Sequence, residues 1–338
     1  MESVMQARRA KIKILYNGRD VSRYVINFSY TDNYDQTDDI SITLSDREKR
    51  WADEWFPETG DTITASIEVF DWNINGDNRE IELGTFEVDN YTYSDIITIN
   101  AVAVPITSSA RSEKKNRAWV DIPLSGIAGD ISSTAGLALV YDTDVDPHYD
   151  NADQNDKSDL YFLGELCKSD GLCMKVTDGQ LIIYEESKYE QQPEVATIIK
   201  GTNDIIGFPR FSRNAKDIYK AATVSYFCPK TNELYQGKFT APMASVGHTL
   251  KLREDYNGES DDMSLGRKAK ARLREKNKYE FTCDITLKGD IIYFSGTNVV
   301  YDGWGNFDGK YHIHRATHAL SNGGYTVSLN TRRCLVGY

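Results

Sequence analysis

The chain has 338 residues, of which 40% are hydrophobic and 27% are charged, and its formal net charge is −12. This length is sufficient for two to four compact domains, each with its own core. The sequence contains no run of about 18 apolar residues, so we expect no membrane insertion. The N-terminal stretch lacks the apolar core of a signal peptide, so we expect synthesis in a cytoplasm.

Charge is distributed unevenly along the chain. Residues 1–104 carry 10 Lys/Arg and 20 Asp/Glu, residues 105–200 carry 9 and 17, and residues 201–338 carry 20 and 14. An acidic front and a mildly basic back predict a polarised particle whose two faces meet different partners. The basic part is too dilute and too poor in arginine clusters for nucleic-acid recognition, so we expect no sequence-specific nucleic acid binding. The five cysteines are scattered without C-x-x-C spacing, which favours reduced core residues.

The first third of the chain is typical of a small barrel or sandwich. Alternating apolar residues predict strands at residues 11–16, 25–30, 40–44, 62–70, 80–90 and 96–104. Gly84 is expected to mark a β-bulge, and Asp46 is expected to cap a short helix that runs to Trp55. We therefore predict a first β-barrel domain at residues 1–104.

Residues 105–200 have a different texture and predict a smaller α+β middle domain. Helical spacing indicates helices at residues 123–134, with a proline in the first turn, and at residues 158–169. Asp178-Gly179 separates two apolar runs, at 173–177 and 180–184, and this predicts a hairpin with a type I′ turn.

Sequence patterns typical of strands return after residue 201. Strands are expected at residues 221–227, 235–239, 280–287, 290–294 and 299–301, and a final hairpin at 310–316 and 325–329. Residues 321–324 (SNGG) should supply the positive-φ positions of its turn. A long loop at 241–263 and a basic helix at 264–277, capped by Ser264, complete this part. We predict a second β-barrel domain at 201–338, with residues 241–277 inserted, and a topology similar to that of the first.

Several residue groups invite a chemical function, and each has a structural alternative that we favour. Six aspartates between residues 142 and 156 suit calcium, but Pro147 stands where an EF-hand needs glycine, which favours a solvated loop. His312, His314 and His318 follow the pattern H-x-H-x-x-x-H. His312 and His314 share one face of the predicted strand and could both bind zinc, but the third ligand would have to come from beyond the strand. Residues 303–310 (GWGNFDGK) lack the spacing of a phosphate loop. We expect no catalytic, cofactor-binding or metal-binding residues. The five tryptophans are expected to be core plugs and interface anchors rather than sugar platforms; they are Trp51, Trp55, Trp72, Trp119 and Trp304.

The C-terminal hairpin carries a family resemblance. Its pattern G–Y–x–I–x–x–x–x–H from Gly309 to His318 (Gly309, Tyr311, Ile313, His318), followed by G-G-Y-x-V-x-L from Gly323 to Leu329, resembles the end of the phage late control protein D family. Residues 124–137 (LSGIAGDISSTAGL) are similar to a helix of that family. Residues 160–185 resemble its aromatic helix and following hairpin, through Gly171, Asp178, Gly179, Leu181 and Ile183. Residues 14–46 resemble its first barrel, through Asp39, Ile40, Ile42 and Leu44.

The resemblance implies a structural baseplate hub rather than an enzyme. In this family three chains, each with two tube-type barrels, form a pseudo-sixfold ring that joins a sixfold tail tube to a threefold spike. It further implies a homotrimer with several partners, namely a central spike protein, a tail tube or tube-initiator protein, a tape measure protein and baseplate wedge proteins. The expected location is the baseplate of a virion or tail-like particle, assembled in the host bacterial cytoplasm.

Two other functions remain open. One is a tail-associated peptidoglycan hydrolase, which needs a carboxylate or metal pair in a cleft. The other is a carbohydrate-binding receptor protein, which needs a row of exposed aromatic side chains. The sequence does not distinguish a DNA-carrying phage from a tail-like bacteriocin or another injection system.

Overall fold

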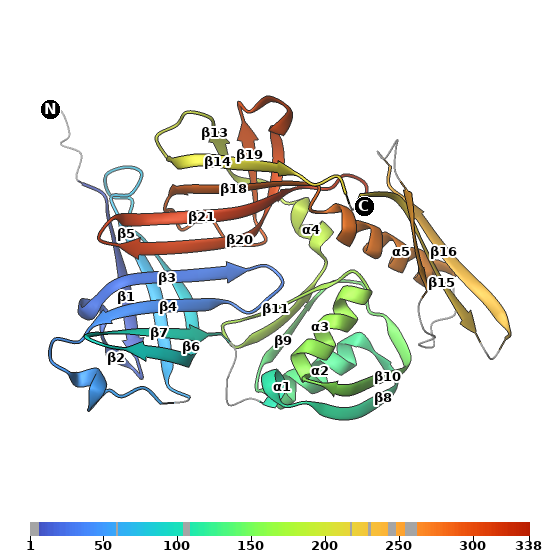
Figure 1. The fold of residues 1–338 in the computed structure, drawn as a ribbon, viewed down its shortest axis with the longest axis horizontal. Coiled ribbons are helices and arrows are strands. Elements are labelled where there is room, and N and C mark those ends of the chain that lie inside the picture. Colours follow the sequence, from blue (N-terminus) through green and yellow to red (C-terminus); the bar gives the residue numbers. More distant parts are fainter. Residues whose placement is uncertain are drawn as a thin grey trace.

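The structure is a computed structural model that describes residues 7–58, 60–103, 109–216, 218–228, 231–242, 248–253 and 262–338. The fold is mainly β, with a small number of helices, as the sequence analysis predicted. Figure 1 shows the arrangement of the strands and helices. Apolar side chains form four separate buried cores.

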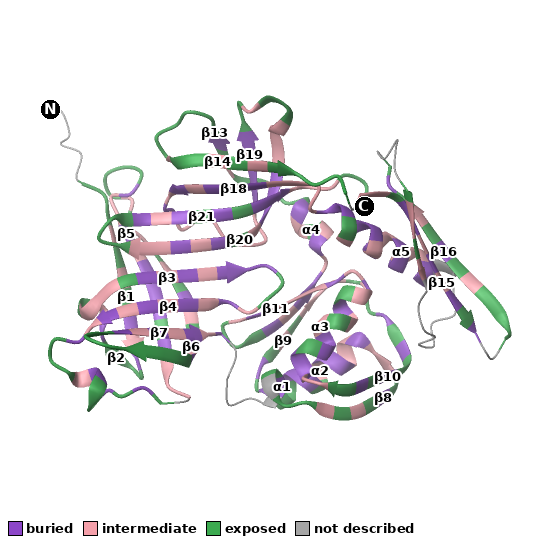
Figure 2. Ribbon diagram, viewed as in Figure 1, coloured by how far each residue is buried: buried purple, intermediate pink, exposed green. Residues whose placement is uncertain are grey.

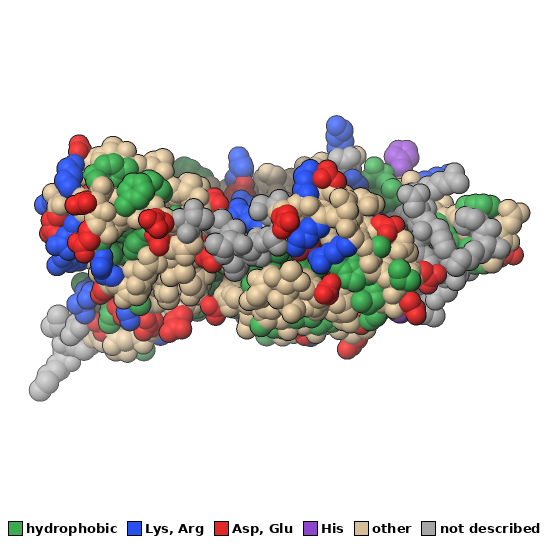
Figure 3. Space-filling model, turned by 90° about the horizontal axis from the view of Figure 1, so that it is seen from below, with side chains coloured by type: hydrophobic (Ala, Val, Ile, Leu, Met, Phe, Trp, Pro, Cys, Tyr) green, Lys and Arg blue, Asp and Glu red, His purple; other side chains and the backbone are tan. Residues whose placement is uncertain are grey.

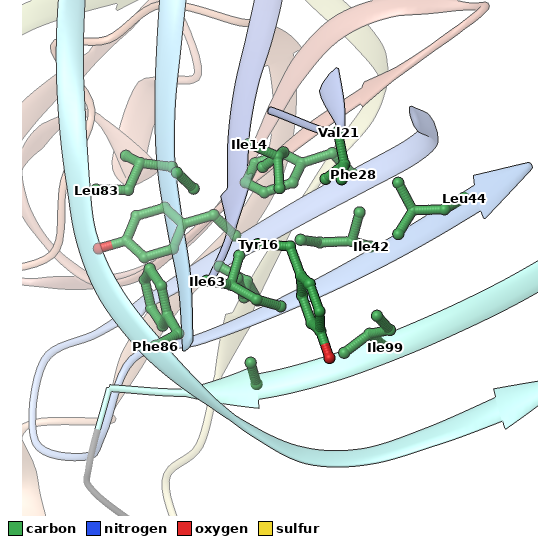
Figure 4. Close-up of a cluster of buried hydrophobic side chains, with 14 of the residues drawn as sticks. Ile14, Tyr16, Val21, Phe28, Ile42, Leu44, Ile63, Leu83, Phe86 and Ile99 are labelled. Atoms are coloured by element: carbon green, nitrogen blue, oxygen red, sulfur yellow. The ribbon is translucent and has the colours of Figure 1, made fainter. Parts of the chain in front are cut away.

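The first core is enclosed by a six-stranded antiparallel sheet with the order β1-β5-β6-β7-β4-β3. The strands are β1 (Arg9–Tyr16), β3 (Val25–Asn33), β4 (Asp39–Ser45), β5 (Thr62–Phe70), β6 (Arg79–Tyr93) and β7 (Ile96–Val102). The short elements β2 (Arg19–Asp20), η1 (Ser22–Tyr24) and η2 (Arg50–Ala52) complete this part. Alternate residues of each strand point inward, and Figure 4 shows them meeting around Tyr16 and Ile63.

A second sheet surrounds another core, with the order β13-β19-β20-β21-β18-β14. Its strands are β13 (Glu194–Ile199), β14 (Ile205–Arg213), β18 (Phe281–Lys288), β19 (Asn298–Asp302), β20 (Gly309–Ser321) and β21 (Gly324–Arg333). The short helix η3 (Gly305–Phe307) lies in the connection between β19 and β20, residues 303–308, and the last two residues of the segment 303–310 begin β20.

The two sheets have the same strand order. Numbered along the chain, the strands of each sheet lie in the order first, fourth, fifth, sixth, third, second. Only one pairing differs in direction, because β13 and β19 are parallel whereas β1 and β5 are antiparallel. Two strand-rich units of similar topology were predicted, and the strand order agrees. The closure of each unit into a barrel, and the division at residues 104 and 200, stay predictions.

The middle part combines helices with two small sheets around a third core. Its elements are α1 (Ser109–Ser112), β8 (Lys115–Pro123), α2 (Leu124–Ala135), β9 (Ala138–Asp142), β10 (His148–Lys157), α3 (Asp159–Ser169), β11 (Cys173–Thr177), β12 (Gln180–Tyr184) and α4 (Glu186–Glu190). Both turn residues of the β11–β12 hairpin have positive φ, 44° at Asp178 and 68° at Gly179, which confirms the predicted type I′ turn.

A fourth core lies outside both large sheets, and this corrects the sequence analysis. Strands β15 (Tyr219–Cys228), β16 (Glu233–Thr240) and β17 (His248–Arg253) form a separate sheet, and helix α5 (Asp262–Asn277) covers one face. We had expected the first two strands in the second barrel and a loop where β17 lies. Helix α5 supplies the apolar partner instead, and Gly237 allows this because a Cβ there would come within 2.1 Å of the Leu265 carbonyl carbon.

Four further expectations were wrong. The Asp46 carboxylate accepts a hydrogen bond from the Trp51 amide at 3.2 Å, but only the short 3-10 helix η2 follows. Residues 290–294 form a turn rather than a strand. Ser264 lies inside α5 rather than at its cap. Most of residues 142–156 belong to β9 and β10, because Tyr149, Ala152 and Gln154 alternate inward along β10.

Candidate inter-subunit surface

The two large sheets are joined by one long strand, β20. Its residues 309–312 pair with β19, whereas residues 315–320 pair with β3 of the first sheet. Eight strands therefore form a continuous antiparallel series, β14-β18-β21-β20-β3-β4-β7-β6, which we call the belt (Figure 1). The pairing between residues 28–33 of β3 and residues 315–320 of β20 is called the joint below.

A buried histidine organises the joint. His318 stacks on Tyr30 with ring centroids 6.0 Å apart, and its Nε2 lies 2.8 Å from the carbonyl oxygen of Tyr293. A carbonyl only accepts, so Nε2 carries the proton, and Nδ1 accepts the hydrogen bond from the Tyr325 hydroxyl at 2.7 Å. Burial lowers the pKa of His318, which keeps the imidazole neutral in this arrangement.

A lysine from the middle part braces the joint from outside. Lys175 of β11 forms ion pairs with Asp32, on the joint strand β3, and with Asp38 at 3.2 Å. Asp32 also accepts hydrogen bonds from the amide and hydroxyl of Ser295. Burial raises the pKa of Asp38 to about 6, and the nearby Asp32 carboxylate adds to this, while Lys175 opposes it. The ion pairs fix the middle part against the first sheet.

A second buried ionic cluster ties α4, α5 and β21 together. Arg332 is fully buried, and its guanidinium lies 2.6 Å from Glu186 and also contacts Glu190. Arg274 reaches the same two carboxylates at 3.1 and 2.5 Å. Arg332 thus pairs with both carboxylates in a site without solvent, where breaking either pair would leave a buried charge uncompensated. The cluster thereby holds the inserted helix α5 against the second sheet.

The two ends of the belt are free edges. Strand β14 pairs with β18 on one side only, and the far end of β6, residues 89–93, pairs with β7 only, within the described part of the chain. Figure 2 shows both edges largely exposed. Phe208 on β14 is 98% exposed, and Tyr91 and Tyr93 on β6 are 36% and 40% exposed. Such edges invite pairing with another strand.

The exposed aromatics of β6 belong to a hydrophobic patch. Seen from below, hydrophobic side chains gather at the left end of the molecule, over the first sheet, with charged side chains around them (Figure 3). Phe56 packs edge-to-face on Tyr91, and Ile96 begins the adjacent strand β7 with 41% of its surface exposed. An exposed patch next to an unpaired strand edge is a feature of interaction surfaces.

The residues singled out for possible chemistry do not converge on one site. His312 is buried against Asn298, His314 is the bulged residue of β20, and His318 lies in the joint. Among the described residues, no group of three or more His, Cys, Asp or Glu side chains is placed to hold a metal. The absence of metal and of catalysis stays a prediction.

Several of the acidic residues have structural partners, and most of the tryptophans are buried. Asp142 contacts Lys188 and Tyr189, and Asp146 caps the start of α2 through Ser125. Four tryptophans are buried, and Trp304 packs on the second core. They do not form an exposed aromatic row, so the structure gives no support to a tryptophan sugar platform.

The exposed edge at β14 was not predicted from the sequence. The Gly207-Phe208-Pro209 segment interrupts the alternation of β14, so the strand was not predicted. The only signal in the sequence was a phenylalanine that stands between glycine and proline, two residues typical of turns. None of the described helices is both long and apolar enough to cross a membrane.

Comparison with known proteins identifies the fold. Neither the protein-family models nor the curated proteins contain a match. Among solved structures, a tail protein from Neisseria meningitidis aligns over 96% of both chains with 13% identity and a TM-score of 0.70. The 43 kDa tail protein of prophage MuSo2 from Shewanella oneidensis gives 13% identity and a TM-score of 0.70, over 96% of this chain and 98% of its own.

A further similar structure comes from a secretion system. The Escherichia coli c3393 protein, a type VI secretion component described as similar to the T4 phage tail proteins gp27 and gp5, aligns over 96% of this chain and 76% of its own, with 11% identity and a TM-score of 0.54. The chain therefore has the fold of phage tail and tail-like proteins, which agrees with the resemblance seen in the sequence.

Proposed function

We propose that this protein is the structural hub of a phage baseplate or a related contractile injection particle. In this proposal three copies form a ring that joins a sixfold tail tube to a threefold central spike. The fold shared with tail proteins supports a structural role in such particles.

One observation carries the proposal, namely the duplicated sheet. Each chain contains two six-stranded sheets with the same strand order, joined side by side through β3 and β20. Three chains would then present six similar units to a sixfold partner, while keeping threefold symmetry elsewhere. The middle part and the inserted β15–β17 sheet occur once per chain, so they suit the threefold side and the periphery.

The partners follow from this arrangement. The six sheet units would contact the tail tube or a tube-initiator protein, and the threefold side would contact the central spike. The tape measure protein and the wedge proteins of the baseplate are the remaining proposed partners. The protein would be assembled in the host cytoplasm and would reside in the finished particle.

Native mass spectrometry and electron microscopy test the proposal together. The purified protein should have three times the 38.2 kDa mass of one chain, and end-on views should show a ring with three strong and six weaker repeats. A chain that remains monomeric at micromolar concentration, or a ring of another order, contradicts it. Zymography on peptidoglycan should show no clearing, whereas a cleared zone would favour the hydrolase alternative.

A further inference from the structure

The joint inside one chain contains a template for the contact between chains. In β6 the register shifts between Val88 and Asn90 relative to β7, which leaves Asp89 as a bulge. In β20 it shifts between Ile313 and Arg315 relative to β21, which leaves His314 as a bulge. Because β6 and β20 hold the same place in the two sheets, the two bulges define an equivalence between them.

An independent feature confirms this equivalence. Superposing the bulges places Ile99 on Leu329, and the next strands then align through their own pairings. Residues 42–44 of β4 fall on residues 285–287 of β18, and both segments read Ile-Thr-Leu. Around the bulges, β6, β7 and β4 therefore correspond residue by residue to β20, β21 and β18.

The equivalence relates the joint to the two free edges. Joint strand β3 corresponds to β14, and residues 315–318 of β20 correspond to residues 90–93 at the far end of β6. The joint pair Thr31 and Thr317 maps onto Ser212 and Thr92. The surfaces that meet inside the chain thus recur, unpaired, at opposite ends of the belt.

Residues that are buried in the joint have partly exposed counterparts at the two free edges. Ala316 and His318 are fully buried, whereas their counterparts Tyr91 and Tyr93 are 36% and 40% exposed. On the other strand, Tyr30 is 4% exposed, whereas its counterpart Phe211 is only half-buried. The edges therefore carry large apolar side chains at the positions that the joint covers.

We propose that β14 of one chain pairs antiparallel with residues 90–93 of β6 of a second copy, in the register that sets Ser212 opposite Thr92. This inference rests on the ring proposed above and names the strands that close it. Phe208, on the bulge of β14, then lies beside the β6–β7 turn of the neighbour, where Ile96 is exposed. Main-chain hydrogen bonds would satisfy both free edges.

Strand direction and charge agree with this pairing. The belt contains eight strands that alternate in direction, so β14 of the next chain meets β6 antiparallel, as β3 meets β20. Arg210 and Arg213 lie on β14, whereas Asp89 and Asp95 lie on or next to the free end of β6. The arginines already pair with Asp284 of β18 and with Glu280 just before it, and the two aspartates with Arg111 and Lys49. Charge therefore favours orientation more than affinity.

Disulfide trapping tests the register directly. The double variant Thr92→Cys/Ser212→Cys in the full chain should, on mild oxidation, give a covalent trimer on non-reducing gels, and each single variant should not. Both positions are exposed, so the changes leave the cores intact. The matched control is Lys13→Cys/Thr197→Cys, which places exposed cysteines on β1 and β13, strands that lie outside the belt and should remain uncrosslinked.

A second variant tests the aromatic anchor. Phe208→Asp alters a side chain with almost no contact inside the chain, so folding should be unchanged, and self-association should weaken at least about tenfold. Val120→Asp, at a 71% exposed position on β8, is the control and should leave the trimer intact.

The outcomes separate this inference from the proposed function. A covalent trimer with the cysteine pair and a weakened trimer with Phe208→Asp support the pairing. A native trimer that neither crosslinks nor responds to Phe208→Asp overturns the pairing and leaves the hub proposal standing. A monomeric wild-type protein overturns both.

Discussion

The substitution Glu186→Gln should show how strongly the buried ionic cluster holds the molecule together. Glu186 begins α4 and is 4% exposed, and its carboxylate faces Arg332 at 2.6 Å, Arg274 at 3.1 Å and Lys278 at 3.7 Å. The change keeps the side-chain shape and removes one charge. It therefore isolates the electrostatic contribution from packing.

The expected cost follows from the charge balance. Glu186, Glu190 and Glu275 face Arg274, Lys278 and Arg332, so the native cluster is neutral. The variant leaves one buried positive charge uncompensated, and breaking a buried pair in this way costs about 3–5 kcal/mol. Against a total stability of about 5–15 kcal/mol, that loss is large.

The pH dependence gives a second signature. Burial alone would raise the pKa of Glu186, but Arg332, Lys278 and Arg274 outweigh it and hold this pKa well below its ordinary value. A depressed pKa means that the stabilisation is complete above the unfolded pKa of about 4.3 and is lost as pH falls through the folded pKa. The difference in the free energy of unfolding between wild type and Glu186→Gln should therefore be constant from pH 6 to 8 and should shrink in strong acid.

Urea denaturation combined with hydrogen exchange is the appropriate assay. A chain with four cores need not unfold in one step, so exchange rates of α4, α5 and β21 show where stability is lost. Glu165→Gln is the control, because its pair with Lys157 is exposed and contributes about 0–1 kcal/mol. A Glu186→Gln loss below about 1 kcal/mol, with unchanged exchange in α4 and α5, would refute this reasoning.

Other predictions concern the hairpin, pH and metals. Gly324→Ala should cost about 1–2 kcal/mol, because Gly324 has φ +104°, whereas Gly323→Ala should cost less, since its φ is not positive; equal losses in thermal unfolding would contradict this. Gly324→Val should in addition prevent particle assembly. Because burial and Asp32 raise the pKa of Asp38 to about 6, the folded state holds its proton longer, so stability falls as pH rises from about 4 to 6. Asp38→Asn should remove up to about 3 kcal/mol of this pH-dependent fall in stability, and a variant with an unaltered pH profile of stability would count against the prediction. Elemental analysis after dialysis should find no stoichiometric zinc or calcium, and near-equimolar metal would overturn this expectation.

Local patterns along the chain determined much of the secondary structure. Alternation places Ile63, Ala65, Ile67 and Val69 on one face of β5, and the structure buries all four. The Asp178-Gly179 turn, the bulge at Gly84 and the helix that ends at Ser169 follow in the same way from residues close in sequence. Of residues 321–324, however, only Gly324 adopts a positive φ. These features are predictable because the energies that set them act within a few residues.

Tertiary structure alone decided which strands meet. A period of two identifies the buried face of a strand but not its neighbour, so the pairing of Thr31 with Thr317 was beyond sequence reasoning. For the same reason β15 and β16 were expected in the second barrel, whereas they form a sheet of their own with β17 and α5. Glu186 and Arg332, which are far apart in the sequence, are likewise paired only by the tertiary structure. The free edges at β14 and β6 exist only once the belt is assembled, because an edge is defined by the partner that a strand lacks.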